Sequence, residues 1–127
     1  MKDFLHVLRE ANLARNEFLD PGGVLDDLFF ATELAGEVGE ACNKVKKLAR
    51  ERLVASGKLR GNFSTSTVEE LAEELADTII SCDLLAALYR IDLRSATARK
   101  WNATSEKVGV PHRITLHGFI SDPSATP

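Results

Sequence analysis

Apolar side chains recur at intervals of three and four residues along most of this chain, which is the pattern of amphipathic helices. The pattern is interrupted at Pro21 and its two glycines, in a Ser- and Thr-rich stretch between residues 50 and 67, and again at Gly109 and Pro111. It predicts helices over about residues 4–19, 24–53, 67–89 and 93–107. Because strand signals are nearly absent, we expect an all-α fold of the four-helix-bundle class.

The third predicted helix is apolar on nearly every side of its C-terminal half, from Ile79 to Leu88. A helix that is apolar all round is normally buried all round. A chain of 127 residues forms one core rather than two. We therefore expect a second subunit to cover this helix, so that oligomerisation completes the bundle. The start of the helix carries a capping-box pattern, with Ser66 and Thr67 each followed three or four residues later by Glu69 or Glu70.

Composition narrows the class of protein. The formal net charge is −3 and charges of both signs are interleaved, which argues against nucleic-acid binding. Cys42 and Cys82 stand in apolar helical patterns without a CxxC motif, so we expect buried thiols and no structural zinc. No signal peptide is recognised, and no apolar run approaches the roughly 20 residues of a membrane span. We expect a cytoplasmic protein with no membrane partner.

Two pairs of acids, Glu37 with Glu40 and Glu74 with Asp77, are the candidate chemistry. Residues three apart are neighbours on one side of a helix. A rotation of 100° per residue places Glu74 and Asp77 on the side that continues into Leu84 and Leu85, so these acids need partners. Either salt bridges or a divalent cation that prefers oxygen ligands would satisfy them. The lysines available for salt bridges are Lys44, Lys46 and Lys47.

The stretches Glu37-Val38-Gly39-Glu40 and Glu73-Glu74-Leu75-Ala76-Asp77 resemble the paired E-x-x-E and E-x-x-D motifs of one enzyme superfamily. These are the MazG-like, all-α nucleoside triphosphate pyrophosphohydrolases, which include dimeric dUTPases and dCTP pyrophosphatases. The resemblance covers about residues 4–111. We expect residues 1–111 to form one domain and residues 112–127 to form a C-terminal tail. It implies Mg²⁺-dependent hydrolysis, with Mn²⁺ as a substitute, of a (deoxy)nucleoside triphosphate to the monophosphate and pyrophosphate. A dNTP is expected, dGTP among the candidates, together with a homodimer or homotetramer.

The same resemblance implies roles for individual residues. The metal ligands it implies are Glu37, Glu40, Glu74 and Asp77. Glu33 or Glu73 is the further acid that orients the attacking water. The candidates for substrate binding are Lys100 and Lys107 for the phosphates, and Asn12, Arg15, Asp26 or Asp27, and Trp101 for the base. For the two aspartates the alternative is a helix cap, and for Trp101 it is a place in the core or an interface.

The chain departs from the family pattern in two places. The segment between the two acidic motifs is longer than in compact members, and the usual Asn and Arg-Tyr-Pro ending is replaced by Thr104, Lys107 and Val108-Gly109. Two other functions stay open. One is phosphoribosyl-ATP pyrophosphatase, from the same superfamily. The other is a non-catalytic helical interaction module whose acids are solvated or salt-bridged.

Overall fold

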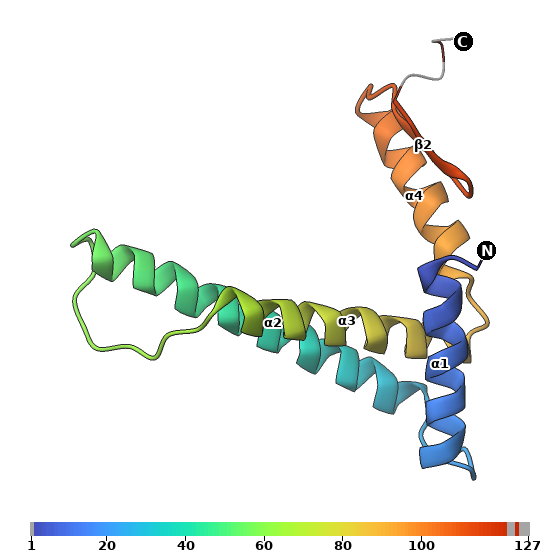
Figure 1. Ribbon diagram of the computed structural model, residues 1–127, viewed down its shortest axis with the longest axis horizontal. Helices are drawn as coiled ribbons and strands as arrows, with labels where there is room; N and C mark the ends of the chain where they lie inside the picture. Colours follow the sequence, from blue (N-terminus) through green and yellow to red (C-terminus); the bar gives the residue numbers. More distant parts are fainter. Residues whose placement is uncertain (1, 122–123, 125–127) are drawn as a thin grey trace.

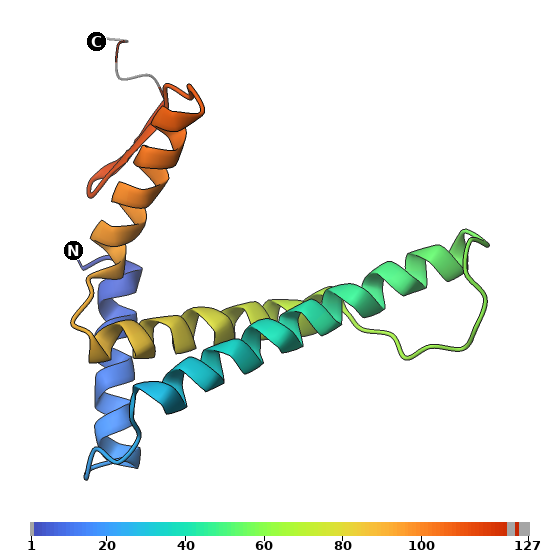
Figure 2. The same cartoon turned by 180° about the vertical axis from the view of Figure 1, so that it is seen from behind.

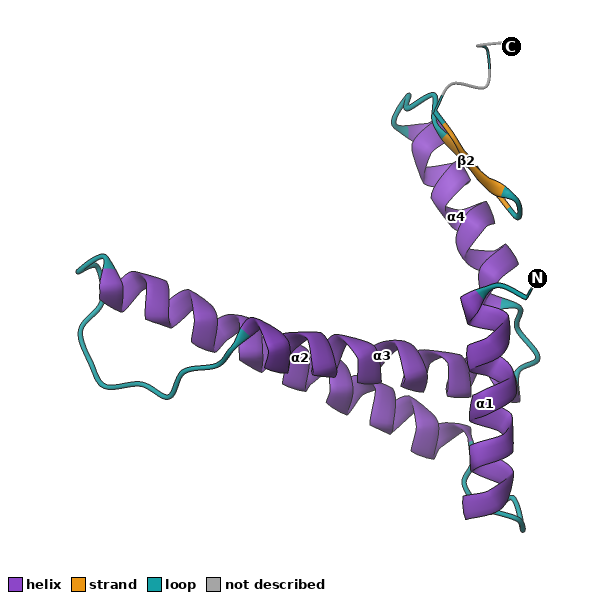
Figure 3. Ribbon diagram, in the orientation of Figure 1, coloured by secondary structure: helices purple, strands orange, loops and turns teal. Residues whose placement is uncertain are grey.

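The computed structural model describes residues 2–121 and 124, and it is helical over most of its length (Figure 1, Figure 3). This confirms the all-α prediction. The described elements are α1 (Phe4–Leu19), α2 (Asp27–Ala55), α3 (Val68–Leu88), α4 (Leu93–Lys107), β1 (Arg113–Thr115) and β2 (Gly118–Ile120). Within these residues, no helix combines the length and the apolar character that crossing a membrane requires.

Each helix begins at a side chain that caps its exposed N–H groups, which explains why the predicted starts lie so near the observed ones. The four N-caps are Asp3, Asp26, Thr67 and Asp92. At α3 the predicted capping box is confirmed: Thr67 Oγ1 accepts from the Glu70 N–H, and the Glu70 carboxylate accepts from the Thr67 N–H, both at 3.1 Å. Glu69 and Glu70 are thus helix-start acids.

The helices α2 and α3 form a long antiparallel hairpin, and α1 lies across one end of it against α3 (Figure 1, Figure 2). Both views show α4 leaving that end and pointing away from the hairpin. Within the described residues, the main packing partner of α4 is β1. A single chain therefore packs three helices together and extends the fourth as an arm, and it does not close a four-helix bundle by itself.

A buried polar network attaches α1 to α3. Asp83 is only 1% exposed, although it lies in the apolar half of α3. Its Oδ1 accepts from Arg9 Nη2 at 2.9 Å and Nε at 3.0 Å, and its Oδ2 accepts from Asn12 Nδ2 at 3.0 Å. Such an acid is tolerated because every carboxylate oxygen has a donor. This network fixes the crossing of α1 over the hairpin.

The apolar core of one chain is small, since the buried apolar residues among those described are Phe30 and three alanines, Ala41, Ala86 and Ala98. The chain exposes 9418 Å². A compact globular protein of 13.9 kDa is expected to expose about 6,700 Å². Cys42 is exposed rather than buried, so the prediction of a buried thiol is wrong for it in the single chain.

Part of the exposed apolar surface lies on one face of the α2–α3 hairpin, which we call the apolar face and define by Val38, Val45, Leu75 and Ile79. These side chains are 43–51% exposed. Successive residues of a helix are rotated by about 100° around its axis. Val38 and Leu75 therefore lie to one side of the acids Glu37 and Glu74 that precede them. Because the helices are antiparallel, both positions lie on the same face.

The C-terminal tail contains a structure that the sequence did not predict. Strands β1 and β2 pair antiparallel, with Ile114 opposite Phe119. The hairpin is held on α4 by Asn102, whose side chain donates to the Ile114 carbonyl and accepts from the Ile114 N–H, each at 2.8 Å. Two three-residue strands are too short for an alternation pattern, so this pairing depends on a contact between distant residues.

Candidate metal centre

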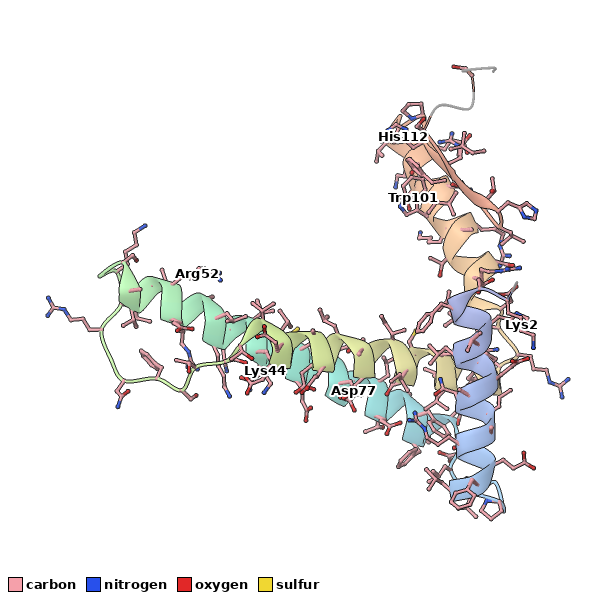
Figure 4. All side chains as sticks on the ribbon, in the orientation of Figure 1. Lys2, Lys44, Arg52, Asp77, Trp101 and His112 are labelled. Atoms are coloured by element: carbon pink, nitrogen blue, oxygen red, sulfur yellow. The ribbon has the colours of Figure 1, made fainter. Side chains whose placement is uncertain are left out.

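Three acids from two helices converge near the middle of the hairpin. Glu37 from α2 and Glu74 and Asp77 from α3 each offer a carboxylate oxygen, and the three oxygens lie within 4.8 Å of one another. Figure 4 shows Asp77 on α3 and Lys44 on α2 in this same region of the pair. The helical spacing accounts for the convergence, because Glu74 and Asp77 are one turn apart on α3 and Glu37 faces them from α2.

The charges of the cluster affect one another. Burial, followed by the negative charge of Asp77, raises the pKa of the Glu37 carboxyl above its ordinary value. Burial also raises the pKa of Glu74, and a hydrogen bond shared with the Glu40 side chain raises it further. Glu40 therefore belongs to the same group, which we call the acidic cluster: Glu37, Glu40, Glu74 and Asp77.

Exposure differs between the two predicted acids of α3. The Glu74 side chain is 16% exposed, as expected for the buried side of the helix. Asp77 is exposed, so the prediction that its side of α3 is buried is wrong at this position in the single chain. The face becomes buried only one turn later, at Ser81, and Leu88 beyond it is again 45% exposed. A cation bound here would have open access to water and to a ligand.

One lysine contributes to this site. Lys44 Nζ lies 3.8 Å from Glu74 Oε1 and 3.8 Å from Glu70 Oε2. Within the described part of the chain, neither Lys46 nor Lys47 has an acid within ion-pair distance of 4 Å. A single ammonium group cannot neutralise four carboxylates, so salt bridges account for only part of the charge. A divalent cation with oxygen ligands is one way to neutralise the remaining charge.

The two acids considered for orienting water differ in position. The charge of Glu33 contributes to raising the pKa of Glu37, so Glu33 lies beside the acidic cluster, on the same side of α2. Glu73 is exposed on α3, and its charge is not among the causes of the raised pKa of Glu37 or of Glu74. Glu33 is the better placed of the two.

The residues expected to hold phosphates lie elsewhere in the chain. Lys100 and Trp101 line a mainly apolar groove of about 600 Å³ along α4, together with Thr104 and Val108. Lys107 is exposed in the last turn of α4. Figure 4 shows Trp101 on the projecting arm and Asp77 on the hairpin, well apart. One chain does not bring Lys100, Trp101 or Lys107 to the acidic cluster.

The residues considered for base recognition have partners within the chain. Asn12 is buried and donates to Asp83, and Arg15 Nη2 donates to Asn12 Oδ1 at 3.3 Å. Asp26 caps α2, as its alternative role predicted. Asp27 accepts a hydrogen bond from the Tyr89 hydroxyl at the end of the hairpin where α2 begins. Of the four candidates, Arg15, Asp26 and Asp27 are exposed to solvent.

Two contacts of the site region were not predicted. The approach of Lys44 to Glu74 was one of several open pairings, since the sequence offered three lysines for it. The hydrogen bond between Tyr89 and Asp27 had no signal in the sequence, because it joins the end of α3 to the start of α2, and these residues are 62 positions apart in the chain.

Comparisons of the chain with known protein families, with characterised proteins and with solved structures found no match.

Proposed function

We propose that this protein is a Mg²⁺-dependent hydrolase that converts a (deoxy)nucleoside triphosphate to a nucleoside monophosphate and pyrophosphate. The observation that supports the proposal is that oxygens of Glu37, Glu74 and Asp77 lie within 4.8 Å of one another, and these residues come from the two motifs that resemble those of the MazG-like enzymes. The donor set suits the ion, because Mg²⁺ prefers carboxylate oxygens and retains several waters.

In this proposal the acidic cluster holds the cation, which when bound neutralises phosphoryl oxygens and lowers the pKa of a coordinated water. Glu33 lies beside the cluster and orients the water that adds across the α–β phosphoanhydride bond. The bond from the α-phosphorus to the bridging oxygen breaks, and pyrophosphate leaves. We assign the substrate to the dNTPs because of the resemblance to MazG-like enzymes. We keep dGTP as one candidate because Asp27 has an exposed carboxylate, the type of acceptor that matches the N1–H and N2–H₂ donors of guanine.

We also propose that the working protein is a homodimer or homotetramer. The accessible surface of the chain exceeds that of a compact monomer by about 2,700 Å². For two chains together the excess is about 5,400 Å², which is in the range of obligate interfaces, since these bury about 2,000–5,000 Å² or more in total over both partners. The apolar face of the hairpin suits such an interface, since it lies away from the acidic cluster and leaves the cluster open. One chain does not bring Lys100 or Lys107 to the cluster, so these lysines would hold the phosphates only if a further chain supplies them from its α4.

Substitution of the cluster tests this function. Glu40→Gln and Asp77→Asn remove a ligand charge while keeping the side-chain shape, and each should abolish Mg²⁺-dependent pyrophosphate release with the helical content unchanged. Glu69→Gln is the matched control, because Glu69 is an exposed acid in the first turn of α3, outside the cluster. Near-normal turnover in either cluster variant would contradict the site. A wild-type protein that binds no Mg²⁺ would favour the non-catalytic interaction module.

A further inference from the structure

A stripe of charged side chains along α2 changes sign halfway. Its members follow one another at spacings of four and three residues, so they line one side of the helix: Glu33, Glu37, Glu40, Lys44 and Lys47. The acids belong to the turns that contain the acidic cluster, and the lysines begin one turn later. Because a helical turn advances about 5.4 Å, a ligand that extends from the cluster toward the α2 C-terminus meets Lys44 first.

The position of Lys44 leaves its hydrogen-bond donors available. Its Nζ lies 3.8 Å from the nearest oxygens of Glu70 and Glu74, whereas charge-assisted N–H···O bonds are about 2.7–2.9 Å long. The ammonium group is therefore close to both acids without bonding to either. Among the described residues, no other Lys or Arg lies within 4 Å of an acidic-cluster carboxylate.

Neither neighbouring acid depends on Lys44 for a partner. Glu70 accepts hydrogen bonds from the Ser66 hydroxyl and from the Thr67 N–H, so its carboxylate is already held at the start of α3. Glu74 is a member of the acidic cluster, and a divalent cation bound there would neutralise its carboxylate. The Lys44 side chain is 22% exposed, so it can reorient without opening the hairpin.

We propose that Lys44 binds a phosphate group of the substrate beside the metal. This inference rests on the proposed function. In the metal-free protein the ammonium group offsets the charge of Glu74. A divalent cation held by the acidic cluster would neutralise that carboxylate. The Lys44 N–H groups would then bind oxygens of a substrate phosphate, as lysine does at other phosphate sites. The ligand class is a polyphosphate chain, with one phosphate at the cation and the next at Lys44.

Lys44→Gln tests the proposal in two independent measurements. In titrations with Mn²⁺ alone, the variant should bind about tenfold more tightly, because the repulsion between the ammonium group and the cation is removed. In pyrophosphate release, its KM should rise about tenfold or more with a smaller change in kcat, because a charged hydrogen bond to the substrate is lost. Lys44→Arg keeps the charge, so its Mn²⁺ affinity and its KM should lie between those of the wild type and those of Lys44→Gln. A role limited to structure would move neither value in this way.

Lys46→Gln is the matched control, because Lys46 is exposed on another side of α2 and should leave both values unchanged. If Lys44→Gln matches this control, or binds Mn²⁺ more weakly than the wild type, the proposal is overturned. If the wild type binds Mn²⁺ but hydrolyses no nucleotide, the proposed function fails separately. Binding of inorganic triphosphate in the presence of Mn²⁺ then decides the role of Lys44: weaker binding by Lys44→Gln supports it, and equal binding overturns it.

Discussion

Replacing Ile79 by Glu should separate the subunits without unfolding the chain. Ile79 is 51% exposed in one chain and lies on the apolar face beside Leu75. Burying the exposed half of such a side chain is worth about 1 kcal/mol, and placing a carboxylate in an apolar contact costs at least about 2 kcal/mol more. In a two-fold dimer the change occurs twice, which gives about 6 kcal/mol. The dissociation constant should therefore rise by a factor of about 10⁴.

The assay is the molar mass by light scattering after gel filtration, over a range of protein concentrations. The matched control is Asn43→Glu, which adds the same charge at an exposed position on another side of α2. The wild type and Asn43→Glu should remain oligomeric, and Ile79→Glu should have the 13.9 kDa mass of one chain with unchanged helical content. A monomeric wild type, or an Ile79→Glu variant that keeps the oligomer mass, would refute this assignment of the interface.

Two further predictions concern stability. Because the pKa values of Glu37 and Glu74 are raised in the folded chain, the metal-free protein should become more stable as the pH falls from 7 toward 5. Mg²⁺ or the substitution Glu74→Gln should reduce this gain in stability. Melting temperatures that fall as the pH is lowered over that range would contradict the prediction. Acids with lowered pKa, such as Asp20, lose their contribution only below their ordinary range and leave this window unaffected. Asp83→Ala removes the carboxylate that Arg9 and Asn12 share and should cost about 3 kcal/mol, or roughly 10 °C of melting temperature, whereas Asp83→Asn should cost less. Equal melting temperatures for Asp83→Ala and the wild type would show that the network adds no stability.

Local sequence patterns determined much of the fold. The periodicity of apolar residues and the capping side chains located the four helices. Both signals are local, because each depends on residues that are only a few positions apart in the sequence. The spacing of Glu74 and Asp77 on one turn predicted that they would act together, and they do lie together with Glu37. These predictions needed only the geometry of one helix at a time.

What the sequence did not predict depends on how helices are placed relative to one another. The departure of α4 from the hairpin follows from the short link between α3 and α4, residues 89–92, and no periodicity encodes its direction. The partners of Asp83 lie more than 70 residues away in sequence, so an acid in an apolar run indicated a need for partners without identifying them. The choice of Lys44 among three lysines was settled by the register of α2 against α3.

Pyrophosphate release from the common NTPs and dNTPs, measured with Mg²⁺, with Mn²⁺ and with chelator, tests the metal-dependent activity of the acidic cluster most directly. We expect one pyrophosphate for each nucleoside monophosphate formed with both metals, and none with chelator. We also expect that the wild type prefers dNTPs and that Asp77→Asn is inactive. Equal activity with chelator, or no pyrophosphate from any nucleotide in the presence of either metal, would contradict the assignment of the acidic cluster as a catalytic metal site.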